Sequence, residues 1–172
     1  MSDIPPLAER LAPDTIETLE RAAQERFTTA EFLREDRRLA ALYFYGYSAE
    51  MCLSAAYFRR EGIPLNAPID REVRHRRMTK ARQLRTPADE PLMTSDPHPL
   101  VGWARFLEWR RLASGALPAE DAQRLKEAIN KAIVIYNYWR PELRYKTLNI
   151  NQKQLDEVRR AAKWLIDNRQ RL

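Results

Sequence analysis

Apolar residues recur every three or four positions along much of this chain. Between residues 122 and 136 the recurring side chains are Ala122, Leu125, Ile129, Ala132, Ile133 and Tyr136. Between residues 152 and 168 they are Leu155, Val158, Ala162 and Leu165. This spacing places apolar side chains on one face and predicts an amphipathic helix in each segment. The sequence lacks the long alternating β-branched runs that indicate strands.

Four more segments have helical spacing: about residues 13–27, 36–60, 70–85 and 100–113. Asp14, with Glu17 three residues later, has the pattern of a capping box, and Asp70 stands near the start of the third segment. Gly62 and Gly115 are each followed within three residues by a proline and indicate helix ends. The six segments therefore have recognisable boundaries.

Two proline-containing stretches interrupt the helical pattern. Residues 86–99 hold four prolines and predict a loop, and Pro141 ends the helix that precedes it. A chain of 172 residues is long enough for one hydrophobic core. We therefore predict an all-α fold, an antiparallel up-and-down bundle of five to six helices in a single domain, residues 1–172.

The segment 39–58 differs from the other helices because it is apolar on every side. One of its faces carries Leu39, Tyr43, Gly46, Glu50, Leu53 and Tyr57. A helix without a polar face is buried all round, so we expect a central helix or a helix at a subunit interface. The second of these alternatives predicts a homodimer through residues 39–58.

Gly46 and Glu50 are the exceptions within this apolar segment. Glycine weakens a helix by about 1 kcal/mol relative to alanine, so we expect a neighbouring backbone to approach Gly46 closely. A buried carboxylate needs a partner, and Arg144 or Tyr145 is the expected partner of Glu50. Two roles are open for Glu50: a structural carboxylate, or a catalytic or ligand-binding group.

The same residues carry a resemblance to the HEPN family (higher eukaryotes and prokaryotes nucleotide-binding domain). Gly46, Glu50 and Leu53 match its G-x-x-x-E-x-x-L core, although Ser54 stands where many members have lysine. Arg144 and Tyr145 resemble the arginine–aromatic pair before the last helix. The resemblance covers roughly residues 13–60 and 120–168, and implies that residues 62–115 are a variable insertion.

Ribonuclease members of the family carry an R-x(4–6)-H motif. No arginine has that spacing before His75 or His98. The resemblance therefore implies a non-ribonuclease binding or assembly module for a nucleotide, working beside a nucleotidyltransferase or a toxin–antitoxin partner, or as a dimer. The alternative is a degenerate metal-independent ribonuclease that uses Arg71 and His75, which share one side of a helix at i, i+4 spacing, with Glu50.

The net charge of +6 is concentrated in one element. Residues 71–85 hold seven Lys/Arg and one Glu, so the other residues sum to zero. On a helix, one stripe carries Arg71, Arg74, Arg82 and Arg85. Arginines in register contact phosphates, so nucleic acid is one partner of this stripe. The other interpretations are a solvated face, or a docking surface for an acidic protein that would make this chain a structural subunit.

The binding hypothesis places the ligand at Arg144, Tyr145 and Lys146 together with this stripe. The sequence gives only weak signals for other kinds of functional site. No apolar run is long enough to cross a membrane, no secretory pattern opens the chain, and the lone Cys52 indicates a reducing cytoplasm and a core role. The motif "SDPHP" favours a surface position for His98 and Asp96, from which a site could recruit them. The sequence indicates no metal site and no cofactor.

Overall fold

The computed structural model describes residues 13–96 and 98–172. Within these residues the chain forms six α-helices, one short 3-10 helix and no β-strand. They are α2 (Ile16–Leu33), α3 (Arg38–Arg60), α4 (Arg71–Gln83), α5 (Leu100–Leu112), α6 (Ala119–Tyr138), η1 (Pro141–Tyr145) and α7 (Gln152–Asn168). The predicted all-α fold is confirmed.

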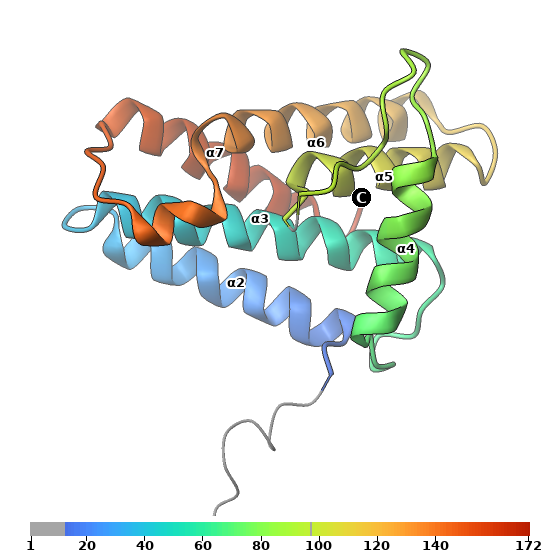
Figure 1. Ribbon diagram of the computed structural model, residues 1–172, viewed down its shortest axis with the longest axis horizontal. Helices are drawn as coiled ribbons and strands as arrows, with labels where there is room; N and C mark the ends of the chain where they lie inside the picture. Colours follow the sequence, from blue (N-terminus) through green and yellow to red (C-terminus); the bar gives the residue numbers. More distant parts are fainter. Residues whose placement is uncertain (1–12, 97) are drawn as a thin grey trace, which may run out of the picture.

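Five of the helices run along the length of the molecule, and α4 crosses one end of the bundle (Figure 1). α2 and α3 form an antiparallel hairpin, with α5, α6 and α7 on the other side of α3 (Figure 1). The 3-10 helix η1 lies beside α3. α3 therefore occupies the centre, in contact with α2, α5, α6, α7 and η1.

The central position of α3 explains its apolar sequence. Its buried side chains include large aromatic and small residues from every side, among them Tyr45, Ala49, Leu53 and Phe58. Other elements of the same chain supply the surfaces that bury them. The prediction of a central helix is confirmed, and the homodimer through residues 39–58 stays a prediction.

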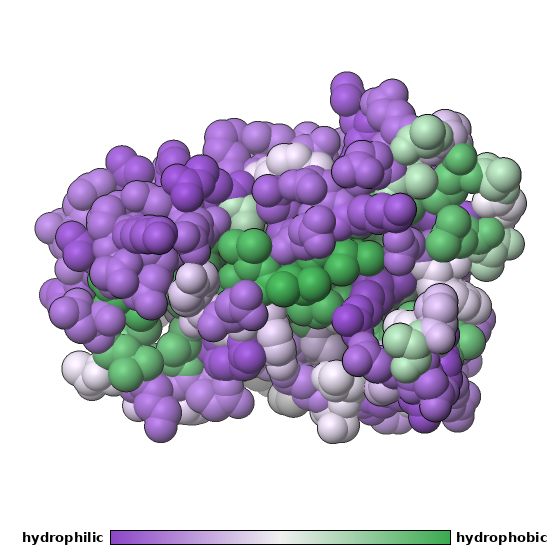
Figure 2. Space-filling model, turned by 90° about the horizontal axis from the view of Figure 1, so that it is seen from above, coloured by the Kyte–Doolittle hydropathy of each residue, from purple (hydrophilic) through white to green (hydrophobic). Residues whose placement is uncertain are grey.

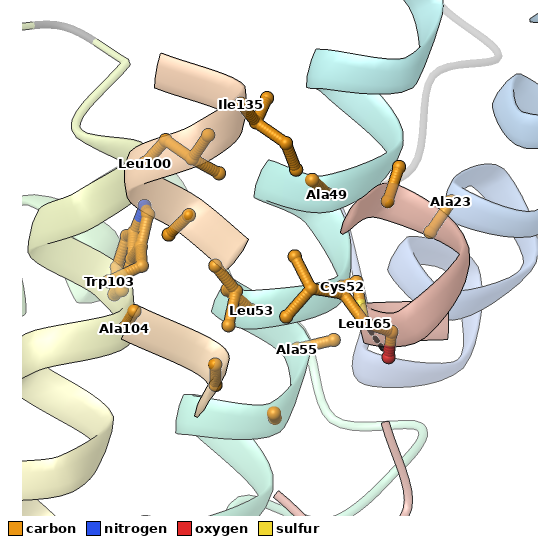
Figure 3. Close-up of a cluster of buried hydrophobic side chains, with 14 of the residues drawn as sticks. Ala23, Ala49, Cys52, Leu53, Ala55, Leu100, Trp103, Ala104, Ile135 and Leu165 are labelled. Carbon is orange, nitrogen blue, oxygen red and sulfur yellow. Dashed lines mark hydrogen bonds between the residues drawn. The ribbon is translucent and has the colours of Figure 1, made fainter. Parts of the chain in front are cut away.

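The core joins α3 to the surrounding helices through interdigitated side chains (Figure 3). Leu53 and Cys52 lie on neighbouring positions of α3 and face different partners, Trp103 and Leu165 among them. The Cys52 thiol donates a hydrogen bond to the Leu165 carbonyl oxygen at 3.2 Å. Burial raises the pKa of this thiol to about 12. Cys52 is a core residue, as predicted.

Two helix boundaries differ from the predictions. Thr15, not Asp14, caps α2, because Thr15 and Thr18 bond reciprocally: each side-chain oxygen accepts from the other residue's backbone N–H. The carbonyl of Asp14 instead accepts from Ile69 N–H at 2.6 Å, which ties the chain before α2 to the chain before α4. α4 ends at Gln83, whereas its predicted cap at Asp70 is correct.

The surface is mostly hydrophilic, with a narrow apolar band across the face seen in Figure 2. The large apolar side chains that are exposed are Phe32, Leu65, Leu112, Ile133, Tyr145 and Leu148. They come from different elements, so most of the apolar content lies in the core. In the ranges that the structure describes, every helix is too short or too polar to cross a membrane.

Candidate functional site

Gly46 makes room for an aromatic ring. A Cβ atom added at Gly46 would lie 2.2 Å from the indole of Trp139, far inside van der Waals contact. The indole N–H donates to the Tyr43 carbonyl oxygen at 3.1 Å, one helical turn before Gly46. The predicted close approach at Gly46 is therefore made by a side chain, and the predicted approach of a backbone is wrong.

Glu50 is buried and holds a histidine from the proline-rich segment. Its side chain is 10% exposed, and its Oε2 accepts a hydrogen bond from Nδ1 of His98 at 2.9 Å. The two residues are 48 positions apart in sequence. The expected partners Arg144 and Tyr145 make no hydrogen bond or ion pair with Glu50 in residues 13–96 and 98–172. The predicted pairing is wrong because the segment that carries His98 folds back onto α3.

Asp96 fixes the backbone that carries His98. One Asp96 carboxylate oxygen accepts from His98 N–H at 2.8 Å, and the other accepts from the Tyr136 hydroxyl at 2.9 Å. Tyr136 belongs to α6, whereas Glu50 belongs to α3. The segment around His98 is thus fastened to two helices, which sets the position of the imidazole.

Aromatic rings surround the imidazole on its inner side. Tyr47 of α3 meets His98 and Trp139 edge-on, with ring centroids 5.3 Å apart in both pairs. His98 and Trp139 are 6.3 Å apart. Trp139 is fully buried, whereas the His98 side chain is 30% exposed. The histidine is therefore partly exposed to solvent and packs on its inner side against the partly buried Tyr47 and the buried Trp139.

Two arginines at η1, Arg140 and Arg144, each lie against the ring of a tyrosine. The guanidinium carbon of Arg140 lies 3.5 Å from the ring centroid of Tyr136, and that of Arg144 lies 4.6 Å from the ring of Tyr145. Tyr145 is 73% exposed. Hydrogen bonding to the Tyr43 hydroxyl is the main reason why the pKa of Arg144 is raised. We name Tyr43, Tyr47, Glu50, His98, Arg144 and Tyr145 the α3–η1 site.

The charges of the α3–η1 site act on the histidine in opposite directions. The hydrogen bond to Glu50 is the largest influence and raises the pKa of His98 above its ordinary value. Burial opposes this rise because it disfavours the charged imidazolium. The negative charge of Asp96 raises the pKa further, and the positive charge of Arg144 lowers it. The net shift is upward, so the imidazolium persists to higher pH than in a free histidine.

This arrangement can hold an anion and exchange a proton. A carboxylate on Nδ1 orients the ring and leaves Nε2 for a ligand. Among the residues that the structure describes, no hydrogen bond engages Nε2. Arg144 offers a planar donor for a phosphate or carboxylate, and the exposed Tyr145 ring offers a stacking surface. No group of three or more His, Cys, Asp or Glu side chains in the described ranges is arranged to hold a metal ion.

The remaining predicted site residues lie at two places. Lys146 directly follows η1 and is exposed, two residues from Arg144. The four stripe arginines lie on or beyond α4: Arg74 pairs with Asp14 at 3.4 Å, and Arg82 donates to the Thr94 carbonyl at 3.1 Å. Arg85 follows the end of α4, so it is not on the helical stripe as predicted. Phosphate binding by these arginines stays a prediction.

The alternative catalytic pair has a different setting. Arg71 and His75 are both exposed on α4. Within the two described ranges neither makes a hydrogen bond or ion pair with Glu50, whose histidine partner is His98. The carboxylate that the ribonuclease alternative requires is thus engaged elsewhere.

Sequence reasoning missed the central role of His98 and Trp139. The motif "SDPHP" indicated a surface histidine, although it also places an acceptor, Asp96, two residues before His98. A buried Glu50 without an obvious partner is a second signal. Neither signal identifies the contact, because only the fold brings residues 50 and 98 together.

Comparisons with family models, with curated proteins and with solved structures found no match to this chain. The resemblance to the HEPN family therefore rests on the residues given above and stays a prediction.

Proposed function

We propose that the protein binds a nucleotide unit, an aromatic base with its phosphate, at the α3–η1 site. The observation that carries the proposal is the placement of the Arg144 guanidinium beside the exposed Tyr145 ring, within electrostatic reach of His98. A guanidinium binds phosphate oxygens in a bidentate manner, and an exposed tyrosine stacks on a base. His98, held through Nδ1 by Glu50, offers its Nε2 as a further polar contact for the phosphate.

Two further features support a nucleotide over a simple anion. The site combines cations with aromatic rings, whereas an inorganic anion would use the cations alone. Stacking of a base on an aromatic side chain contributes about 1–3 kcal/mol, and it tolerates any base. The residues involved, Arg144 and Tyr145, are also those that carry the resemblance to a nucleotide-binding family.

Binding of the 5′-phosphorylated dinucleotide pApA to the purified protein tests this proposal by calorimetry. We expect Tyr145→Ala to weaken binding about 5- to 150-fold, which corresponds to removal of one stacking interaction. Arg144→Ala should weaken it at least 10-fold. Arg160→Ala is the matched control, because Arg160 is an exposed arginine on α7. Equal affinities for all four proteins, or no binding of pApA, would exclude the proposal.

The Glu50–His98 hydrogen bond favours a second candidate function, the cleavage of RNA without a metal ion. In this reaction Nε2 of neutral His98 takes the proton of a ribose 2′-hydroxyl, whose oxygen attacks the adjacent phosphorus. A 2′,3′-cyclic phosphate forms, the bond from phosphorus to the 5′-oxygen breaks, and that oxygen takes a proton from solvent. In this reaction Arg144 offsets the charge that develops on the phosphate.

Incubation with end-labelled single-stranded RNA separates the two candidates. Cleavage that disappears in His98→Ala and persists in His75→Ala would support the second candidate. RNA that remains intact between pH 6 and 9 would remove it and leave binding without catalysis.

A further inference from the structure

An open groove of about 530 Å³ lies at the end of the bundle next to the α3–η1 site. One wall is the turn between α2 and α3 with the first residues of α3, and the other is the connection from η1 to α7. Both segments lie at the same end of the molecule in Figure 1. We name this feature the α3 groove; it is lined by residues 35–40 and 146–150.

The α3 groove has an excess of unpaired positive charge. Arg37, Arg38 and Lys146 are exposed and form no ion pair within residues 13–96 and 98–172. Of the two acidic lining residues, Glu35 is already paired with Arg34 at 3.1 Å. Within the described part of the chain, three cations without an ion pair therefore face one such carboxylate, Asp36. The groove thus favours an anionic ligand.

The residues that line the α3 groove are close neighbours in sequence of the residues of the α3–η1 site. Lys146 comes two residues after Arg144. On the opposite wall, Leu39 precedes Tyr43 by one turn of α3, which is about 6 Å along the helix axis. Arg144 of the α3–η1 site is thus followed by a second set of cations, Lys146 with Arg37 and Arg38, in the α3 groove.

We infer that the α3 groove is a second phosphate subsite, so that the ligand is a single-stranded oligonucleotide and not a mononucleotide. This inference rests on the proposed binding of a nucleotide unit at the α3–η1 site. A strand repeats its phosphate charge along its length, which suits two neighbouring sets of cations. An acidic peptide would also suit the cations, but it would leave the exposed Tyr145 ring without a stacking partner.

A length series of oligoadenylates tests the inference, from pApA to an eight-nucleotide strand, in RNA and DNA versions. We expect affinity to rise at least 10-fold between two and six nucleotides. The double variant Arg37→Gln, Arg38→Gln should remove this rise and leave the affinity for pApA unchanged. The slope of log affinity against log salt should become shallower by about 0.7 for each phosphate that the double variant no longer neutralises.

A variant with the same change in charge elsewhere is the control: Arg21→Gln, Arg160→Gln. These two residues are exposed and lie outside the groove. Their replacement should leave the length dependence intact. The RNA and DNA series identify which sugar the groove accepts, and a rise with length in either one supports the inference.

Three outcomes would overturn the second subsite. One is equal affinity for two and six nucleotides. Another is an equal weakening of both ligands in the groove variant. The third is a poly-glutamate peptide that binds the groove as tightly as the six-nucleotide strand. Failure of the nucleotide proposal is distinguishable, because it appears as absence of pApA binding or as insensitivity to Arg144→Ala.

Discussion

Because Gly46 has no side chain, the Trp139 indole fills the space in which a Cβ atom would lie. Four residues later, Glu50 is the buried acceptor for His98. Both residues look unfavourable in an apolar helix, and each is explained by one side chain from a distant part of the chain. Because the two contacts share Tyr47 and Trp139 as neighbours, the packing at Gly46 also supports the wall behind His98.

Gly46→Ala should destabilise the protein. Alanine favours a helix by about 1 kcal/mol over glycine, but its methyl group would overlap the indole of Trp139. Overpacking of this kind costs about 1–3 kcal/mol, so we expect a lower free energy of unfolding in urea. In a Trp139→Ala background the clash is gone, and the same substitution should stabilise. Stabilisation by Gly46→Ala in the wild-type background would contradict the contact.

Glu50→Gln should lower the pKa of His98, because the carboxylate is the main cause of its upward shift. The measurement is an NMR titration of the imidazole protons. The chain has two histidines, and a His75→Ala variant identifies which signal belongs to His98. An unchanged His98 titration would show that Glu50 does not hold the ring.

The same shift gives stability a defined pH dependence. A group whose folded pKa is raised stabilises the fold fully below its unfolded pKa, about 6.5 for histidine, and loses that effect as pH rises through the folded pKa. His98→Gln should therefore cost more stability at pH 6 than at pH 9. Since the side chain is partly exposed, the difference should be about 1 kcal/mol or less. A larger cost at pH 9 would contradict the sign.

At the scale of elements, residue spacing predicts the helices well because periodicity is local. The 3–4 spacing of apolar residues identifies α6 and α7, and the Asp70 cap is recognisable in the sequence because its bond spans three residues. The α2 cap is misplaced by one residue since Asp14 and Thr15 are both good caps. The contact of His98 with Glu50 depends on the path of the segment between α4 and α5, and no local pattern encodes that path.

This proline-rich segment is held by side-chain bonds to α3 and α6. Tyr136→Phe removes the hydrogen bond to Asp96 and should increase amide hydrogen exchange in residues 92–96 and at His98, with a global cost of about 0.5–1.5 kcal/mol. Tyr138→Phe is the matched control, because Tyr138 lies on the same helix and bonds Glu157 of α7. Equal exchange in both variants would show that Asp96 does not anchor the segment.

At the scale of the whole molecule, two groups of basic side chains are candidates for binding an anionic ligand. The sequence concentrates the net charge of +6 on residues 71–85, yet Arg74 and Arg82 are engaged by the chain itself. The cations of the α3–η1 site and the α3 groove are spread over distant parts of the sequence, so a count along the chain does not reveal them. The fold brings Arg37 and Arg38 to the same groove as Lys146, two residues after Arg144 and the exposed Tyr145.

These two basic regions make competing predictions for oligonucleotide binding. If the account is correct, Arg144→Ala should weaken a six-nucleotide strand at least 10-fold, whereas Arg71→Ala should change its affinity less than threefold. The measurement is fluorescence anisotropy at constant ionic strength, because affinities for nucleic acid depend steeply on salt. The reverse ranking would move the binding surface to α4.

The most direct test of the central claim is an NMR titration of the ¹⁵N-labelled protein with pApA. We expect the largest chemical-shift changes on the Trp139 indole, Arg144 and Tyr145, together with the backbone of His98. Arg144→Ala should abolish them, whereas Arg160→Ala should leave them in place. Changes confined to α4, or no changes up to millimolar pApA, would contradict the claim that the α3–η1 site binds a nucleotide.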